Sequence, residues 1–260
     1  NYSGLGVTGC FSNTVNNAPA AYPGFGSAFE TLGNVAVGEV YVLVVSNFSN
    51  SSSGFTLSFN ATSPINYRSA GSTITWSGGT NTAWNLASNW GGCTPPNCTI
   101  DASIVPGSAS QPVISASTSV KNLTINNGAT LTINSGVTLS VCGDYINNGN
   151  LMASPNSTLL FNNGSTVQTI DGALVNADKF GNLTITKTGG QVNLQQNIDL
   201  GGSLTLSNNT SVLNTNGKYI KISGNVTNAA GNTTLAGIGS TGTMEFTGTS
   251  SQNYNQGSSN

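Results

Sequence analysis

Carboxylates are the side chains in this chain with the clearest capacity for chemistry, because its 260 residues include no histidine. Enzymes that cleave polysaccharides use a pair of carboxylates, or an Arg or Lys base beside acidic metal ligands, gathered on one face. The eight acidic residues are Glu30, Glu39, Asp101, Asp144, Asp171, Asp178, Asp199 and Glu245. They form no close acidic motif, although Asp171 and Asp178 are near enough in sequence to share a turn. We therefore expect turn and cap residues, assign no catalytic residue, and predict that the chain is not an enzyme.

Metal binding is a second chemistry that these residue types allow. Asp and Asn side chains, together with turn carbonyls, are suitable hard ligands for calcium. The EF-hand loop and the glycine-aspartate nonapeptide of calcium-binding β-rolls are both missing from the sequence, and the absence of histidine removes the usual zinc ligand. We expect no bound cofactor and keep calcium as the one open alternative.

The charges exclude one class of partner. The chain has six basic and eight acidic residues, and its cations are scattered from Arg68 to Lys221. Nucleic-acid binding needs clustered Lys and Arg side chains to neutralise phosphates. We therefore expect no nucleic acid. We expect no membrane span either, since no apolar run approaches the roughly 20 residues that cross a bilayer.

Four cysteines carry the remaining chemistry. Cys93 and Cys98 flank Thr-Pro-Pro-Asn, a tight turn that a disulfide could close in an exported protein, whereas the absence of histidine and of a neighbouring third cysteine argues against a metal site there. Cys10 and Cys142 lie in different predicted domains and are not expected to pair with each other. We interpret each as a small buried side chain, or Cys10 as one that has lost a partner upstream.

The elements that must position these residues are clearest in the segment Val120–Gly149. Apolar residues there alternate with Asn, Thr and Ser in three short blocks separated by Asn-Gly or Ser-Gly. Alternation of period two places one side of each block on a buried face, and the glycine-containing pairs supply corners of positive φ. The inward residues expected from this alternation are Leu123, Ile125, Leu131, Ile133, Leu139 and Val141. The pattern predicts the stacked turns of a β-solenoid.

Similar blocks return later in the chain. Asn182–Ile185 repeats the Asn-Leu-Thr-Ile of Asn122–Ile125, and Thr158–Phe161 is echoed by Thr243–Phe246. Recurrence at this scale indicates a stacked, extended body. Inward positions expected in the second half are Val192, Leu194, Ile198, Leu200, Leu204, Leu206, Ile220, Ile222 and Val226.

We predict an all-β fold in three parts. Residues 1–64 are interpreted as the C-terminal part of a jelly-roll-like β-sandwich, with strands at Gly38–Val45 and Gly54–Phe59. Residues 65–117 are expected to form a linker and a tryptophan-rich solenoid cap. Residues 118–260 are expected to form a parallel β-solenoid of about seven turns of roughly 20 residues each, right-handed as parallel crossovers usually are. The composition does not change toward either end of the sequence, so we expect the chain to be a segment of a longer protein.

Three tryptophans mark the segment before the expected solenoid: Trp76, Trp84 and Trp90. The first turn of a solenoid has an exposed end, which bulky aromatic side chains can cover. Capping is therefore the role we expect. The alternative is a sugar-stacking platform, because tryptophan rings also bind the faces of sugars.

Two segments are similar to parts of large surface proteins of gliding Bacteroidota. Gly38–Phe59, which begins Gly-Glu-Val-Tyr-Val-Leu-Val-Val-Ser-Asn-Phe-Ser, resembles the closing strands of their jelly-roll modules. The tryptophan segment, followed by Asn-Leu-Thr-Ile from Asn122 and Gly-Ala-Thr-Leu-Thr-Ile from Gly128, resembles their β-solenoid repeats. Proteins of this class are exported by the type IX secretion system, and many are adhesins linked to gliding motility. The resemblance implies an extracellular location at the cell surface.

These observations lead to one functional expectation. We expect a structural or adhesive segment of a long cell-surface adhesin that supports attachment or gliding motility. Its partners would be the neighbouring domains of the same long chain, with cell-surface or substratum polysaccharide as a further partner. The alternative is a β-helix protein that binds or degrades polysaccharide.

Overall fold

The computed structural model describes residues 73–91, 94–172, 179–229 and 242–256, together with the backbone of three further short strands. The chain divides into two compact units, Asn1–Ser72 and Thr73–Asn260. In the first unit, β1 (Gly6–Val7) pairs antiparallel with β2 (Asn16–Asn17). The strands predicted at Gly38–Val45 and Gly54–Phe59 lie outside the described residues, so the β-sandwich stays a prediction.

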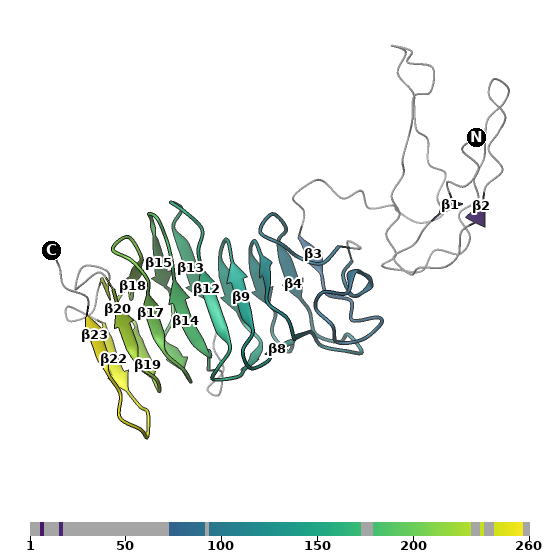
Figure 1. The fold of residues 1–260 in the computed structure, drawn as a ribbon. Helices are drawn as coiled ribbons and strands as arrows, with labels where there is room; N and C mark the ends of the chain where they lie inside the picture. The colour runs from purple at the N-terminus through teal and green to yellow at the C-terminus, as the bar shows by residue number, and fades with distance from the viewer. Residues whose placement is uncertain are drawn as a thin grey trace, which may run out of the picture. The chain divides into compact units, whose positions relative to one another are not determined.

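The second unit is a parallel β-solenoid, as the alternating blocks predicted, and Figure 1 shows its strands stacked side by side from β3 to β23. We name its three faces A, B and C. Face A is one eight-stranded sheet: β3 (Ile74–Thr75), β4 (Ala102–Ile104), β7 (Leu123–Ile125), β10 (Tyr145–Asn147), β13 (Gln168–Asp171), β15 (Gln191–Leu194), β18 (Val212–Asn214) and β21 (Leu235–Ala236). Face B is one seven-stranded sheet: β6 (Thr118–Val120), β9 (Thr138–Val141), β12 (Thr158–Phe161), β14 (Asn182–Ile185), β17 (Leu204–Leu206), β20 (Val226–Asn228) and β23 (Tyr254–Gln256).

Face C consists of two three-stranded sheets joined by single bridges. The first holds β5 (Val113–Ile114), β8 (Thr130–Ile133) and β11 (Asn150–Ala153), and the second holds β16 (Ile198–Leu200), β19 (Tyr219–Ile222) and β22 (Thr243–Phe246). Parallel bridges from Met152 to Lys179 and from Phe180 to Leu200 connect the two sheets. Each turn therefore runs from face A to face C to face B. The single helix in the described ranges is the 3-10 turn η1 (Ala87–Asn89).

The apolar residues that alternate along the strands form one continuous core. All of the inward positions predicted from the sequence, in both halves of the solenoid, are buried. On face B, for example, Leu139, Leu159, Leu183, Leu204 and Val226 stack directly above one another and are at most 3% exposed. A core of this kind grows by one layer with each turn.

The solenoid begins earlier in the chain than predicted. β3 pairs with β4, and β4 pairs with β7, so stacking on face A starts at Ile74 rather than near residue 118. β3, β4 and β5 contain only two or three residues each. A strand that short shows no more than one alternation of apolar and polar residues, and unlike β7, which is equally short, these three lie outside the run of alternating blocks from Val120 to Gly149.

Corners between the faces follow the glycine-containing pairs. Gly128 and Gly136 have φ values of +80° and +74°, as the Asn-Gly and Ser-Gly pairs predicted. Gly149 does not adopt positive φ. Glycine is required there because a side chain does not fit: a Cβ would lie 2.6 Å from the carbonyl oxygen of Ala129 in the turn before.

Candidate functional site

The three tryptophans pack on one another beside β3, at the end of face A where the stacking begins. Trp76 and Trp84 each meet Trp90 edge to face, with ring centroids 5.0 and 4.7 Å apart. Each ring is only 1% exposed. Nε1 of Trp76 donates to the carbonyl of Ser110, and Nε1 of Trp90 donates to the carbonyl of Trp84, both at 2.7 Å. In this structure the rings therefore present no open face on which a sugar could stack.

Asn89, which the sequence analysis did not single out, organises the loop around these rings. It is fully buried, and its Oδ1 accepts hydrogen bonds from the backbone N–H groups of Thr80 and Asn81. Its Nδ2 donates to Asn81 Oδ1 and to the carbonyl of Ala83, both at 2.9 Å. All four bonds are short-range. The position of Asn89 directly before Trp90 was the only signal available in the sequence.

The disulfide that involves Cys98 is not the predicted one. Cys98 is bonded to Cys142, 44 residues further along, and their Cα atoms lie 5.3 Å apart. The prediction that Cys98 pairs with Cys93 is thus wrong, as is the interpretation of Cys142 as an unpaired buried side chain. The stacking of the turns explains the pairing, because the loop before β4 and the corner after β9 lie on the same edge of the solenoid. Cys93 and Cys10 lie outside the described residues.

The acidic residues in the described ranges are each engaged in local structure. Three of them form ion pairs: Asp101 with Lys121 at 3.4 Å, Asp199 with Lys179 at 3.4 Å, and Glu245 with Lys221 at 3.7 Å. The other two accept backbone hydrogen bonds: Asp144 from Thr169 and Asp171 from Gly172. Within the same ranges, no group of three or more Cys, Asp or Glu side chains could hold a metal ion. Glu30, Glu39 and Asp178 lie outside them.

A buried lysine is the most unusual polar group in the core. Lys187 is 0% exposed, and its Nζ donates to the carbonyl of Asn163 at 2.6 Å and to Gln168 Oε1 at 2.7 Å. Gln168 Nε2 in turn donates to the carbonyls of Val141 and Gly143. Burial lowers the pKa of Lys187 below its ordinary value, because desolvation disfavours the charged amine. Sequence reasoning missed this network, since the residues come from three different turns.

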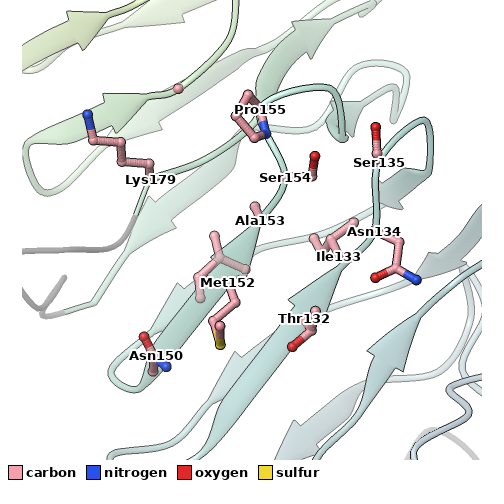
Figure 2. Close-up of a pocket in the computed structure, with 12 residues that line it drawn as sticks. Thr132, Ile133, Asn134, Ser135, Asn150, Met152, Ala153, Ser154, Pro155 and Lys179 are labelled. Atoms are coloured by element: carbon pink, nitrogen blue, oxygen red, sulfur yellow. The ribbon is translucent and has the colours of Figure 1, made fainter.

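An open groove of about 640 Å³ crosses face C, and we take it as the candidate binding site. It is lined by Thr132–Ser135, Asn150–Pro155, Lys179 and Gly201. Figure 2 shows Asn150, Met152 and Ala153 following one strand, with Thr132–Asn134 on and after its neighbour and Lys179 on the opposite side. Met152 is 58% exposed although it lies on a strand. The groove was not predicted: of its lining residues, the sequence analysis assigned only Ile133, as an inward position.

The lining of this groove is mostly apolar, with uncharged polar groups among the apolar side chains. Met152 and Pro155 provide apolar surface, while the amides of Asn134 and Asn150 and the hydroxyl of Thr132 can both donate and accept hydrogen bonds. Lys179 is the only charged residue in the lining, and Asp199 already neutralises it. A sugar ring has the matching properties, with apolar C–H faces and a rim of hydroxyls.

Charges of alternating sign follow face C from the groove toward the C-terminal end of the solenoid. Lys179 pairs with Asp199, which is the register partner of Lys221, which is the register partner of Glu245. Ion pairs exposed in this way contribute only about 0.2–1 kcal/mol each. Their alternation nevertheless favours this order of the turns, because leaving one turn out of the stack would place like charges next to each other.

Comparison with known proteins adds a family match and no activity. A family model described as "Domain of unknown function (DUF8693)" matches residues 75–177, from β3 through the tryptophan segment to just beyond β13. That range is less than half of the chain. No curated protein and no solved structure matches the chain. In the described residues, no helix has the length and apolar character needed to cross a membrane.

Proposed function

We propose that this chain is a structural and adhesive segment of a long cell-surface adhesin, exported by the type IX route and used in attachment or gliding motility. The observation that supports this proposal is the uninterrupted core, which runs through every turn from β3 to β20. Because each turn is hydrogen-bonded to the next, such a body adds length without a larger globular core. Its physical role is to hold a binding region at a distance from the cell.

The state of the acidic side chains supports a role without catalysis. Each of the five described carboxylates has at least one oxygen paired with a lysine or a backbone N–H group. A glycosidase or lyase would keep at least two carboxyl groups directed at the substrate. The Cys98–Cys142 disulfide supports an extracellular location, since disulfides persist in oxidising compartments.

The experiment that tests this function is removal of the solenoid from the full-length protein in its own organism. We expect antibody or protease accessibility to place the intact protein on the cell surface, and in-frame deletion of the segment to reduce attachment or gliding. A protein found only inside the cell, or a deletion strain that attaches and glides normally, would contradict the proposal. Release of reducing ends or unsaturated products from a polysaccharide panel would contradict its non-catalytic part.

Polysaccharide binding is a second candidate function, which the groove on face C supports. We expect Met152→Asp to abolish binding on a glycan array, because it places a charge against the apolar face of the sugar. The matched control is Thr184→Asp, which adds the same charge on face B, away from the groove. Equal loss in both variants would show a general effect of charge, and no binding by the unmodified chain would remove this candidate.

A further inference from the structure

The tripeptide Asn-Asn-Gly occurs three times in the chain, at residues 126–128, 147–149 and 162–164. An asparagine followed by glycine can deamidate without an enzyme, because the backbone nitrogen of the glycine can reach the side-chain amide carbon and no Cβ restricts the approach. The three copies share the reacting residues, so their local sequence predicts similar reactivity. Their surroundings in the solenoid are different.

The first copy lies at an exposed corner between β7 and β8. Asn127 and Gly128 are both exposed, and the N–H of Ala129 donates to the carbonyl of Asn126 at 2.9 Å, which closes a four-residue turn around them. Gly128 has a φ of +80°. Among the described residues, no hydrogen bond holds the side chain of Asn127 or the N–H of Gly128. The peptide group between these two residues can therefore rotate while the ends of the turn stay in place.

The second copy lies at the same corner one turn later, where the connection is shorter. Between the register pairs that join β7 to β10 and β8 to β11, the corner of the first copy has four residues and that of the second has two. In this tighter corner Gly149 is buried, and its N–H donates to Asn147 Oδ1 at 3.0 Å. The N–H of Asn148 donates to the carbonyl of Ile125 at 2.8 Å. The nitrogen that would attack Asn148 is thus already held.

The third copy, after β12, is held by the buried lysine. The carbonyl oxygen of Asn163 belongs to the peptide group that joins this residue to Gly164, and it accepts a hydrogen bond from Nζ of Lys187 at 2.6 Å. The side-chain Nδ2 of Asn163 donates to the carbonyl of Cys142 in the turn before. Neighbouring turns therefore fix both the amide that would lose ammonia and the peptide group that would attack it.

We propose that Asn127 is a site of deamidation in the folded chain, and that the stacking of the turns protects Asn148 and Asn163. The nitrogen of Gly128 attacks Cγ of Asn127, the Cγ–Nδ2 bond breaks, and ammonia leaves with the proton of the Gly128 N–H. Water then opens the resulting succinimide at one of its two carbonyls, which gives aspartate or isoaspartate. The product places one negative charge at a corner that otherwise has none. This inference does not depend on the proposed role in adhesion.

Ageing of the folded chain at mildly alkaline pH, followed by chymotryptic peptide mapping with tandem mass spectrometry, tests the proposal. The conversion is measured at each asparagine as the gain in mass when NH is replaced by oxygen. We expect Asn127 to convert at least about tenfold faster than Asn148 and Asn163, because these two react only after a local opening breaks their hydrogen bonds. The reference is the same chain reduced and unfolded in guanidinium chloride, where all three should convert at similar rates.

Three results would overturn the proposal. Asn127 could stay intact in the folded chain while it reacts in the unfolded one, or it could react no faster than the other two asparagines when folded. The unfolded chain could also show the same preference for Asn127, which would assign the difference to local sequence and not to the fold.

The variant Lys187→Met tests the protection by itself. Removing the amine frees the carbonyl of Asn163, so conversion of Asn163 should rise roughly three- to tenfold while that of Asn127 stays the same. Asn148 is the matched control within the same molecule, because other hydrogen bonds hold its corner. An unchanged rate at Asn163, or an equal rise at Asn148, would overturn the protective role assigned to Lys187.

Discussion

Nζ of Lys187 lies 2.7 Å from Gln168 Oε1, in the buried interior of the solenoid. Through this bond the amine is connected to Val141, since Gln168 Nε2 donates to the carbonyl of that residue at 2.9 Å. The network therefore links the ends of β9 and β14 with the start of β13. In the described ranges Lys187 has no acidic partner within ion-pair distance, so hydrogen bonds alone satisfy its amine.

We expect Lys187→Met to lower the free energy of unfolding although it removes a buried amine. The methionine fills a similar volume, but the carbonyl of Asn163 and Gln168 Oε1 lose their donor in a buried corner. Leaving buried acceptors unsatisfied costs about 1–3 kcal/mol. Urea denaturation measures the difference. Lys218→Met, at a more accessible corner, is the control and should change stability little; a more stable Lys187→Met variant would show that the network costs more than it contributes.

The same lysine makes stability depend on pH. Burial lowers the pKa of Lys187 in the folded chain, whereas the unfolded chain keeps a value near 10.4. Between these two pKa values the unfolded state binds more protons than the folded state, so the free energy of unfolding rises with pH across that window. Below the pKa of Lys187 in the folded state, this group no longer makes the free energy of unfolding depend on pH. Urea denaturation at several pH values up to about 10 should show this rise in the unmodified chain and a smaller rise in Lys187→Met; equal slopes would contradict it.

The disulfide gives a prediction that is independent of the core. Peptide mapping without reduction should recover Cys98 linked to Cys142, and a Cys93–Cys98 peptide would contradict the structure. Closing a loop across a separation of 44 residues stabilises by up to about 4 kcal/mol in the chain-entropy model. Cys98→Ser and Cys142→Ser should therefore lower stability by similar amounts. The double variant should lose little more than either single one, because both remove the same bond.

The sequence was sufficient to predict the strands, but not to assign each strand to a face of the solenoid. Asn122–Ile125 and Asn182–Ile185 share the letters Asn-Leu-Thr-Ile, yet the first contributes to face A and the second to face B. The turns differ in length, as hydrogen bonds between neighbouring turns show: Asn150 and Thr130 are 20 residues apart, and Asn253 and Asn225 are 28 apart. Local alternation identifies strands, whereas the face of each strand depends on corner lengths that alternation does not reveal.

Polar groups that join different turns were beyond sequence reasoning for the same reason. Gln168 donates to Val141 and Gly143, and Gln252 donates in the same way to Ile222 and Gly224. Each glutamine follows one of the two blocks recognised as echoes, Thr158–Phe161 and Thr243–Phe246. The recurrence therefore reflected a shared corner structure as well as shared strands. Recognising it required knowing which carbonyl groups lie beside each glutamine. The disulfide was misassigned for a similar reason, because the sequence does not show which cysteines the stacked turns bring together.

The repeated Asn-Leu-Thr-Ile blocks show why glycine follows asparagine one turn later. Asn122 Oδ1 accepts the backbone N–H of Asp144 at 2.7 Å, and Asn182 Oδ1 accepts that of Ser203 at 2.8 Å. Gly143 precedes Asp144 just as Gly202 precedes Ser203. A Cβ on either glycine would overlap the asparagine oxygen of the turn before. The asparagine oxygen thus occupies the space that a side chain on the glycine would need, so the two residues form one contact.

Double-mutant cycles on the pairs Asn122–Gly143 and Asn182–Gly202 should give different coupling energies. Gly143→Ala should destabilise the unmodified chain by about 1–3 kcal/mol, as overpacking does, and by clearly less in an Asn122→Ala background, because the overlapping oxygen is gone. Gly202→Ala should remain costly in an Asn182→Ala background, since its Cβ would still lie 2.6 Å from the carbonyl oxygen of Pro155. Urea denaturation of the seven chains, with the unmodified chain common to both cycles, measures both coupling energies. No coupling in either pair would show that the asparagine oxygen is not what excludes a side chain at these corners, and equal coupling in both would show that the carbonyl of Pro155 does not exclude one at Gly202.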